Sequence, residues 1–254
     1  MFLIVFGHNI LKVVNNMYQR IMVIALMLGM ICGIIFNFPA NALDDKPTIY
    51  LTFDDGPSVY TSQVLDILDR YDIKATFFVT ADNPEYFDEI TNAYQQGHVI
   101  GLHTASHSYA TIYKSVDAYF TDLDLISEVV EQRTGKKSTY IRFPGGSSNT
   151  ISEKYHHGIM AKLVSEVDQR GYQYFDWNAE IGDAKKYHSV SSIIETGKKQ
   201  GDGKHDMMLL CHDGNSNEDT VKALPTLLTY YLSLGYQFKT IDDSTPVFHH
   251  HIAD

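Results

Sequence analysis

The fold of this chain is decided by the stretch Thr48-Ile49-Tyr50-Leu51-Thr52-Phe53-Asp54-Asp55-Gly56-Pro57. Its first six residues alternate in polarity and are rich in β-branched and aromatic side chains, which is typical of a strand. Two carboxylates and a Gly-Pro turn follow at once. We therefore predict a strand over residues 48–53 that ends in a polar loop.

The same alternation of strand and helix patterns continues along the chain. Further strands are expected at 75–79, 98–102, 139–143, 172–177, 207–211 and 237–241, with helices between them at 61–71, 84–96, 116–132, 158–170, 190–200 and 219–234. Strands that alternate with helices indicate a parallel sheet, and about seven such units in about 200 residues suggest a barrel. The expected fold class is α/β, a (β/α) barrel with about seven parallel strands.

Residues 1–42 differ from the rest of the chain. They contain no acidic residue, and Lys12 and Arg20 are their only lysine and arginine. Residues 21–36 are an apolar run that is short for a membrane span, which needs about 20 residues. The following Pro39-Ala40-Asn41-Ala42 fits the small-residue pattern of a signal-peptidase site. We expect a signal peptide or, if the segment is retained, an N-terminal membrane anchor; both Met1 and Met17 remain open as starts.

A single catalytic domain is expected at 43–254, a length that one barrel can fill. Without the first 42 residues the net charge changes from −11 to −13, so nucleic acid is not an expected partner. Cys211 is the only cysteine of that domain, so no internal disulfide is expected. We expect a monomer that is secreted or extracytoplasmic, with membrane contact only if residues 21–36 are retained.

Polar side chains recur where the predicted strands end. They are Asp54, Asp55, His103, His107, Arg142, Asp183 and His212. In a parallel barrel these strand ends meet on one face, where active sites lie. The sequence therefore predicts one site that is assembled from distant segments.

His103 and His107 have the spacing that places two imidazoles on one side of a helical turn, where they can chelate a divalent ion. Such a pair is by itself more often two ordinary histidines. Asp55 would complete a set of three ligands that leaves positions for water and substrate. Adjacent residues on an extended chain point to opposite sides, so Asp55 would bind the metal while Asp54 takes a proton. A solvated turn or a helix cap is the alternative for the two aspartates.

Four ordered motifs resemble the polysaccharide deacetylase (NodB-homology) family. They are Thr52-Phe53-Asp54-Asp55-Gly56-Pro57, His103-x-x-x-His107, Arg142-x-Pro144-Gly145 and Leu210-Cys211-His212-Asp213, and they span about residues 46 to 242. The resemblance implies a distorted (β/α) barrel and the hydrolysis of N-acetyl or O-acetyl groups on glycans. It also implies a divalent ion, often Zn²⁺, on Asp55, His103 and His107; Co²⁺ and other ions suit the same ligands.

The resemblance implies roles for the remaining residues. Asp54 would be the general base, and Arg142 would orient it and keep it ionised. His212 would be the general acid that protonates the leaving amine. Asp183 would raise the pKa of His212, so that this residue is protonated when needed.

Two positions depart from the family pattern. Gly145 stands where many members have Tyr, but its backbone N–H would still hold the oxyanion, since a main-chain donor works whatever the side chain. Ala184 follows Asp183 where the family commonly has Trp, which leaves the glycan specificity open. Leu210 matches the residue that lines the pocket for the acetyl methyl group.

The expected substrate is an N-acetylhexosamine polymer, with peptidoglycan N-acetylglucosamine as the first candidate. A signal segment without an appended binding module fits an enzyme that works near its own cell wall. Chitooligosaccharide deacetylase, acetyl-xylan deacetylase and a catalytically silent glycan-binding barrel remain alternatives. The polar run at 146–149 is either a sugar contact or a plain turn, and residues 249–251, three histidines, are interpreted as a solvated tail.

Overall fold

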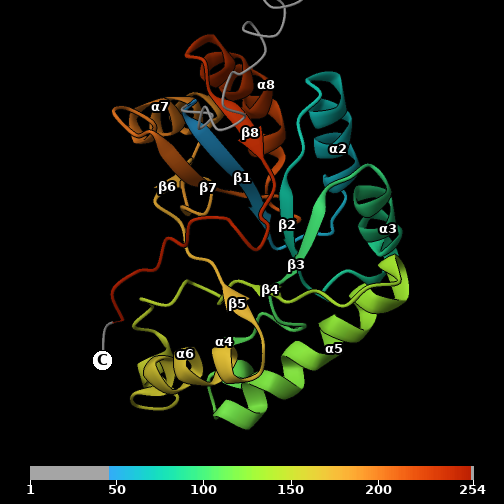
Figure 1. Cartoon of the computed structure of the whole chain (residues 1–254), viewed down its shortest axis with the longest axis vertical. Helices are drawn as coiled ribbons and strands as arrows, with labels where there is room; N and C mark the ends of the chain where they lie inside the picture. The colour runs from blue at the N-terminus through green and yellow to red at the C-terminus, as the bar shows by residue number, and fades with distance from the viewer. Residues whose placement is uncertain (1–45, 253–254) are drawn as a thin grey trace, which may run out of the picture. The chain divides into compact units, whose positions relative to one another are not determined.

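The computed structural model describes residues 46–252, so the segment predicted at 1–42 lies outside the described residues. The described part is one parallel sheet with helices packed around it (Figure 1). Its strands are β1 (Thr48–Asp54), β2 (Thr76–Val79), β3 (Val99–Leu102), β4 (Tyr140–Ile141), β5 (Gln173–Tyr174), β6 (Ala179–Glu180), β7 (Asp206–His212) and β8 (Gln237–Lys239). Its helices are α2 (Thr61–Arg70), α3 (Asp88–Gln95), α4 (Tyr109–Ile112), α5 (Val116–Thr134), α6 (Ile159–Gln169), α7 (Val190–Gln200) and α8 (Glu218–Ser233), with short 3₁₀ helices η1 (Pro84–Tyr86) and η2 (Ser152–Lys154).

The strands follow the order β5-β4-β3-β2-β1-β7-β6, and β8 pairs with the first residues of β1. Every ladder is parallel. Among the described residues no ladder joins β5 to β6, each of which has only two residues, so the barrel is open there. The predicted distorted (β/α) barrel is confirmed, with eight strands in place of about seven.

The two faces of β1 have different surroundings because successive side chains of a strand point to opposite sides. Ile49, Leu51 and Phe53 belong to the large apolar cluster that the sheet shares with the helices. Thr52 and Asp54 lie on the other face, which is the inner face of the open barrel. The floor of that inner face is a second, smaller apolar cluster, formed by Phe78, Phe175, Met208 and Ile241.

The carboxyl ends of the strands bring the predicted polar residues together. Asp54 ends β1 and His212 ends β7, and the two are direct partners in the ladder. His103 follows β3, and Arg142 follows β4. Asp183 lies three residues beyond β6, a strand that the sequence pattern did not indicate. The expectation that one face collects these residues is therefore met.

Several elements differ from the sequence expectation. The helix expected at 84–96 is divided into η1 and α3. A tight 3₁₀ turn is common at a helix start, and here Pro84 opens it. The strands expected at 139–143 and 172–177 keep only two hydrogen-bonded residues each, and β6 and α4 are too short to show any periodicity in sequence.

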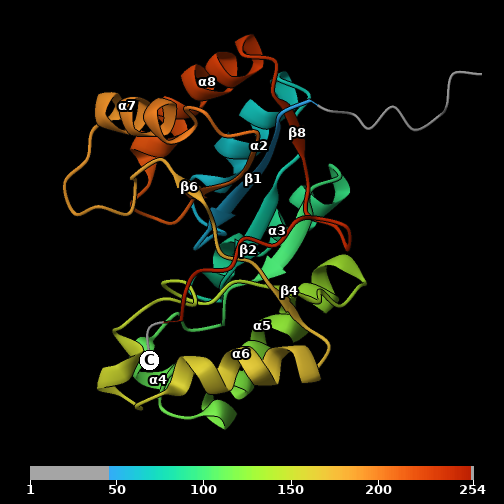
Figure 2. The same ribbon diagram turned by 60° about the vertical axis from the view of Figure 1, so that its left-hand side comes forward.

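His249 is exposed and His250 partly exposed, as expected of a solvated tail, but both make contacts with the domain that the interpretation did not foresee. The His249 ring stacks on the Tyr174 ring, with centroids 3.8 Å apart and planes at 8°. The His250 backbone N–H donates to Asp176 Oδ2 at 2.8 Å, and its Nε2 lies 2.7 Å from the Trp177 carbonyl oxygen. Figure 2 shows this segment running from β8 towards α6. Contacts with the end of β5 thus order the C-terminal segment.

Two further findings concern the described residues alone. Cys211 is buried in β7 and free. None of the described helices combines the length and the hydropathy that crossing a membrane requires.

Candidate active site

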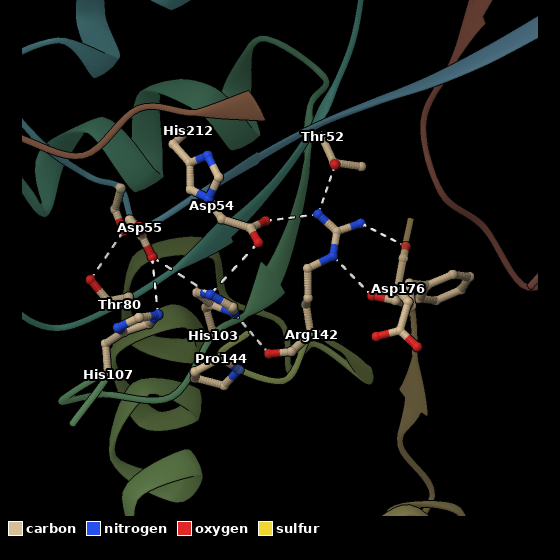
Figure 3. A network of polar contacts seen from close by, with 12 residues as sticks. Thr52, Asp54, Asp55, Thr80, His103, His107, Arg142, Pro144, Asp176 and His212 are labelled. Atoms are coloured by element: carbon tan, nitrogen blue, oxygen red, sulfur yellow. Dashed lines mark hydrogen bonds and ion pairs between the residues drawn. The ribbon is translucent and has the colours of Figure 1, made fainter. Parts of the chain in front are cut away.

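Asp55, His103 and His107 form a cluster of metal-ligand type. Their donor atoms all lie within 4.8 Å of one another. Asp55 Oδ1 is 3.5 Å from His103 Nε2 and 3.4 Å from His107 Nε2 (Figure 3). The same Asp55 oxygen is buried and has no hydrogen-bond partner among the described residues. An unpaired carboxylate oxygen beside two imidazole nitrogens is a donor set that fits a divalent transition metal.

The backbone around this cluster is unusual. Asp55, Thr104 and His107 have φ values of 73°, 66° and 48°, in the left-handed region that few non-glycine residues adopt. β1 ends at Asp54, so strand alternation does not separate the two aspartates, and that prediction is wrong. Both carboxylates approach His103 Nε2, Asp54 Oδ2 at 3.6 Å and Asp55 Oδ1 at 3.5 Å. The left-handed turn at Asp55 is what brings its carboxylate back towards the histidines.

The segment between the two histidines is a loop and not the helical turn that the spacing suggested. A buried carboxylate from α5 organises it. Asp122 Oδ1 accepts hydrogen bonds from the backbone N–H groups of Ala105 at 2.7 Å and Ser106 at 2.9 Å. The sequence analysis missed Asp122; an acidic residue on the apolar side of a predicted helix was the available signal.

His103 is held in the tautomer that a metal ligand needs. Its Nδ1 lies 2.8 Å from the Arg142 carbonyl oxygen, which can only accept, so Nδ1 carries the proton and Nε2 presents its lone pair. Burial, together with the neighbouring His107, lowers the pKa of His103 to about 3. The imidazole is therefore neutral at ordinary pH, as metal binding requires.

Arg142 is fully buried and anchors the inner wall of the site. Its Nη1 donates to Asp54 Oδ1 at 2.8 Å and to Thr52 Oγ1 at 2.7 Å. Its Nε donates to the Phe175 carbonyl at 2.9 Å, and Nη2 donates to the Asp176 carbonyl at 3.1 Å. Burial raises the pKa of Asp54, and the charge of Arg142 opposes that shift. The guanidinium thus fixes Oδ1 of Asp54 and leaves Oδ2 on the side of His103.

His212, the ladder partner of Asp54, forms an ion pair with Asp183. Its Nδ1 lies 2.8 Å from Asp183 Oδ1, and its backbone N–H donates to Asp183 Oδ2 at 2.8 Å. Thr220 also donates to that oxygen, at 2.8 Å. Burial would lower the pKa of His212, but the hydrogen bond and charge of Asp183 outweigh it and raise the pKa to about 9. The sequence expectation that these two residues meet is met in the structure.

Gly145 lies in the turn after β4, and Leu210 lies in β7. The backbone turns at residues 143–146, where the Gly146 N–H donates to the Phe143 carbonyl at 2.7 Å. In the part of the chain that the structure describes, the N–H of Gly145 has no acceptor. Leu210 is buried in β7, on the same strand face as His212.

Asp176 is a second residue that the sequence analysis missed. It is fully buried at the end of β5, and its carboxylate accepts from the Ser147 backbone N–H at 2.8 Å and from Ser147 Oγ at 2.5 Å. Asn149 is also buried, and its side chain donates to the Gly146 carbonyl at 2.9 Å. Ser147 and Asn149, the two buried polar side chains of the run 146–149, therefore point inward, and the run acts as a structural turn. An acidic residue near the end of the strand predicted at 172–177 was the available signal for Asp176.

Comparison with known proteins agrees with this geometry. Residues 42–160 match the family model described as polysaccharide deacetylase. The peptidoglycan-N-acetylmuramic acid deacetylase PdaA of Bacillus subtilis is 32% identical over 211 residues, which cover 78% of this chain and 71% of PdaA. A peptidoglycan-N-acetylglucosamine deacetylase of Bacillus cereus is 30% identical over 210 residues, 79% of this chain and 89% of that protein.

Among solved structures, the catalytic domain of a peptidoglycan N-acetylglucosamine deacetylase from Eubacterium rectale has a TM-score of 0.80 with this chain. It is 40% identical in sequence, and the match covers 82% of this chain and 94% of that domain. The resemblance seen in the four motifs is thereby confirmed. This chain belongs to the polysaccharide deacetylase family of hydrolases.

Proposed function

We propose that this chain removes N-acetyl groups from an N-acetylhexosamine polymer, with peptidoglycan N-acetylglucosamine as substrate, in a metal-dependent reaction. The observation that carries the proposal is the ligand cluster of Asp55, His103 and His107 beside Asp54. Asp54 in turn is the ladder partner of His212, at the carboxyl ends of β1 and β7. The names of the relatives support the choice of polymer, since two of those compared are named as peptidoglycan N-acetylglucosamine deacetylases and the third as a peptidoglycan N-acetylmuramic acid deacetylase.

The three cluster residues would hold the metal through Asp55 Oδ1, His103 Nε2 and His107 Nε2. A divalent ion held there would supply Lewis acidity for the acetyl carbonyl and would raise the acidity of the attacking water. Two imidazoles and one carboxylate suit Zn²⁺, our first choice, and also Co²⁺.

Asp54 takes the proton of the attacking water. Arg142 occupies its Oδ1, so Oδ2, on the side of the ligand cluster, is the oxygen that accepts the proton. Arg142 keeps this carboxylate oriented and favours its ionised form. As the water oxygen bonds to the acetyl carbon, the N–H of Gly145 stabilises the charge on the acetyl oxygen, and Leu210 lines the space for the methyl group.

His212 returns a proton to the leaving nitrogen. Asp183 occupies its Nδ1, so Nε2 is the nitrogen that donates. With a pKa of about 9, His212 is protonated at neutral pH. Cleavage of the carbon–nitrogen bond and protonation of the nitrogen then give acetate and a free amine on the sugar.

We also propose that the protein acts outside the cytoplasm. The apolar run at 21–36 and the small residues up to Ala42 support secretion, or attachment to the membrane if the segment is retained. Mass spectrometry of the protein recovered from the culture medium and from membranes would test this, because cleavage after Ala42 gives a defined new N-terminus.

Acetate release from N-acetylglucosamine oligomers and from isolated peptidoglycan tests the activity. We expect release from peptidoglycan by the zinc-loaded protein and almost none by Asp54→Asn. Release from acetyl-xylan and from none of the other glycans would identify the protein as an acetyl-xylan deacetylase instead. No release from any of these glycans, with zinc shown by elemental analysis to be bound, would favour the catalytically silent glycan-binding barrel.

A further inference from the structure

Tyr109, the first residue of α4, connects the histidine loop with the turn that carries Gly145. Its ring meets the His107 ring edge to face, with centroids 5.8 Å apart and planes at 90°. It also packs on Tyr113 with centroids 5.4 Å apart, and the Tyr113 hydroxyl donates to the Pro144 carbonyl at 2.6 Å. The Tyr109 ring is thus fixed between a proposed metal ligand and the turn at 143–146.

The Tyr109 hydroxyl lies directly against the backbone of Gly145. A Cβ placed on Gly145 would be 2.4 Å from Tyr109 Oη, closer than nonbonded atoms approach. The φ of Gly145 is 77°, a left-handed value that glycine adopts without strain. Glycine at this position therefore satisfies the backbone and also leaves room for a hydroxyl group from another element.

Two hydrogen-bond donors without acceptors adjoin at this place. No hydrogen bond between described residues involves Tyr109 Oη, although the side chain is half-buried. The neighbouring Gly145 N–H likewise has no acceptor among those residues. A tyrosine hydroxyl carries one O–H donor. Both donors are therefore available to a bound substrate.

We propose that the Tyr109 hydroxyl donates a second hydrogen bond to the acetyl oxygen of the substrate, beside that of the Gly145 N–H. The inference rests on the proposed function and adds a catalytic residue to it. The acetyl oxygen gains negative charge as water adds to the carbonyl carbon. A donor placed there stabilises the transition state more than the bound substrate, so Tyr109 acts on kcat and not on KM.

Tyr109→Phe tests the proposal because it removes the hydroxyl and keeps the ring contacts with His107 and Tyr113. Loss of one oxyanion donor in a buried site lowers kcat by about 10²- to 10³-fold; for the half-buried Tyr109 we expect about 10- to 100-fold. KM, zinc content and Tm should equal those of the wild type. Tyr71→Phe is the matched control: its hydroxyl bonds to Pro225 O and Thr229 Oγ1 between α2 and α8, and its loss should leave kcat unchanged.

A binding measurement separates the oxyanion role from simple substrate contact. Calorimetry with N-acetylglucosamine tetramer is done on zinc-loaded Asp54→Asn, which converts the tetramer only slowly, with and without Tyr109→Phe. Equal Kd values are expected, because the hydroxyl acts on charge that develops only during reaction. A rise in Kd that matches the whole loss of kcat/KM would overturn the oxyanion role.

Gly145→Ala provides a second test of the geometry. Beside Tyr109 the new methyl group meets the hydroxyl at 2.4 Å, whereas in Tyr109→Phe the nearest remaining atoms are Asn149 Cβ at 3.2 Å and Cζ of residue 109 at 3.3 Å. Gly145→Ala should therefore reduce kcat by a larger factor in the wild type than in Tyr109→Phe. Equal factors would overturn the placement of the hydroxyl. A wild-type rate in Tyr109→Phe would overturn this inference alone; no acetate release by the wild type would overturn the proposed function as well.

Discussion

The two walls of the site are held in different ways. On the inner wall, Arg142 is fully buried, and its hydrogen bonds reach Asp54, Thr52 and two backbone carbonyls. On the outer wall, Asp55 and His107 adopt left-handed backbone angles, and Asp55 Oδ1 is buried without a hydrogen-bond partner among the described residues. On the inner wall the polar groups have hydrogen-bond partners within the chain, whereas the described part of the outer wall keeps unpaired donor atoms of the kind that bind a metal ion. Changes on the inner wall should therefore lower the free energy of unfolding, and changes on the outer wall should lower the affinity for the metal.

The largest effect is expected on the inner wall. Arg142→Met leaves the Asp54 carboxylate buried without its partner, and breaking a buried ion pair in this way reduces the free energy of unfolding by about 3–5 kcal/mol. Urea unfolding measures the change. Arg133→Met is the control, because Arg133 pairs with Asp88 on the surface and its loss should change that free energy by at most about 1 kcal/mol. Equal unfolding midpoints for the two variants would contradict the comparison.

On the outer wall, a change should affect the metal more than the fold. Asp122→Ala removes the acceptor of the Ala105 and Ser106 N–H groups that shapes the histidine loop. Loss of such a supporting contact lowers metal affinity by about 10- to 100-fold. Zinc competition with a chromogenic chelator measures this affinity. Asp124→Ala, an exposed residue of the same helix, should leave it unchanged. If both variants bind zinc as the wild type does, Asp122 does not support the outer wall.

The pair of His212 and Asp183 should make both stability and activity depend on pH. Because Asp183 raises the pKa of His212 to about 9, the pair stabilises the folded state fully below the unfolded pKa of about 6.5, and this contribution is lost as pH rises through about 9. Activity that needs protonated His212 should fall over the same alkaline range. Asp183→Asn should move that fall towards about pH 6.5 and lower kcat at pH 8 by about 30-fold. A pH–rate profile unchanged in Asp183→Asn would exclude His212 as the acid.

The smallest effect is expected from the C-terminal segment. Removal of residues 248–254 deletes the stacking of His249 on Tyr174 and the bond from His250 to Asp176, which supports the inner wall from outside. We expect a decrease in Tm of about 2–4 °C, which corresponds to about 1 kcal/mol in a domain of this size. His251→Ala, at an exposed position, should leave Tm unchanged. A truncated protein with the wild-type Tm would show that the segment adds no stability.

The sequence allowed prediction of the site where side chains follow long strands. Asp54 and His212 end the two longest strands, whose alternating or apolar patterns are clear, and the parallel fold then makes them neighbours. The supporting residues could not be predicted in this way. Asp122 lies on the apolar side of a predicted helix and Asp176 near the end of a predicted strand, but their roles, like that of Tyr109, depend on contacts between elements distant in sequence, which sequence patterns do not reveal.

The separation of Asp54 from Asp55 illustrates the same limit. The sequence analysis assigned different roles to the two residues, but on the argument of strand alternation. In the structure, the left-handed turn at Asp55 and the ion pair of Arg142 with Asp54 make the distinction. The ion pair joins segments that are distant in sequence, and the backbone angle at Asp55 leaves no pattern of polarity that the sequence could show.

Zinc content of Asp54→Asn and Asp55→Asn, measured by elemental analysis on the purified proteins together with acetate release, tests the central claim most directly. The account predicts that Asp54→Asn keeps wild-type zinc and loses kcat by about 10²- to 10⁴-fold, as removal of a general base does. It predicts that Asp55→Asn loses both zinc and activity, because Asp55 Oδ1 adjoins both histidine nitrogens. Full zinc occupancy in both variants would contradict the assignment of Asp55 to the metal.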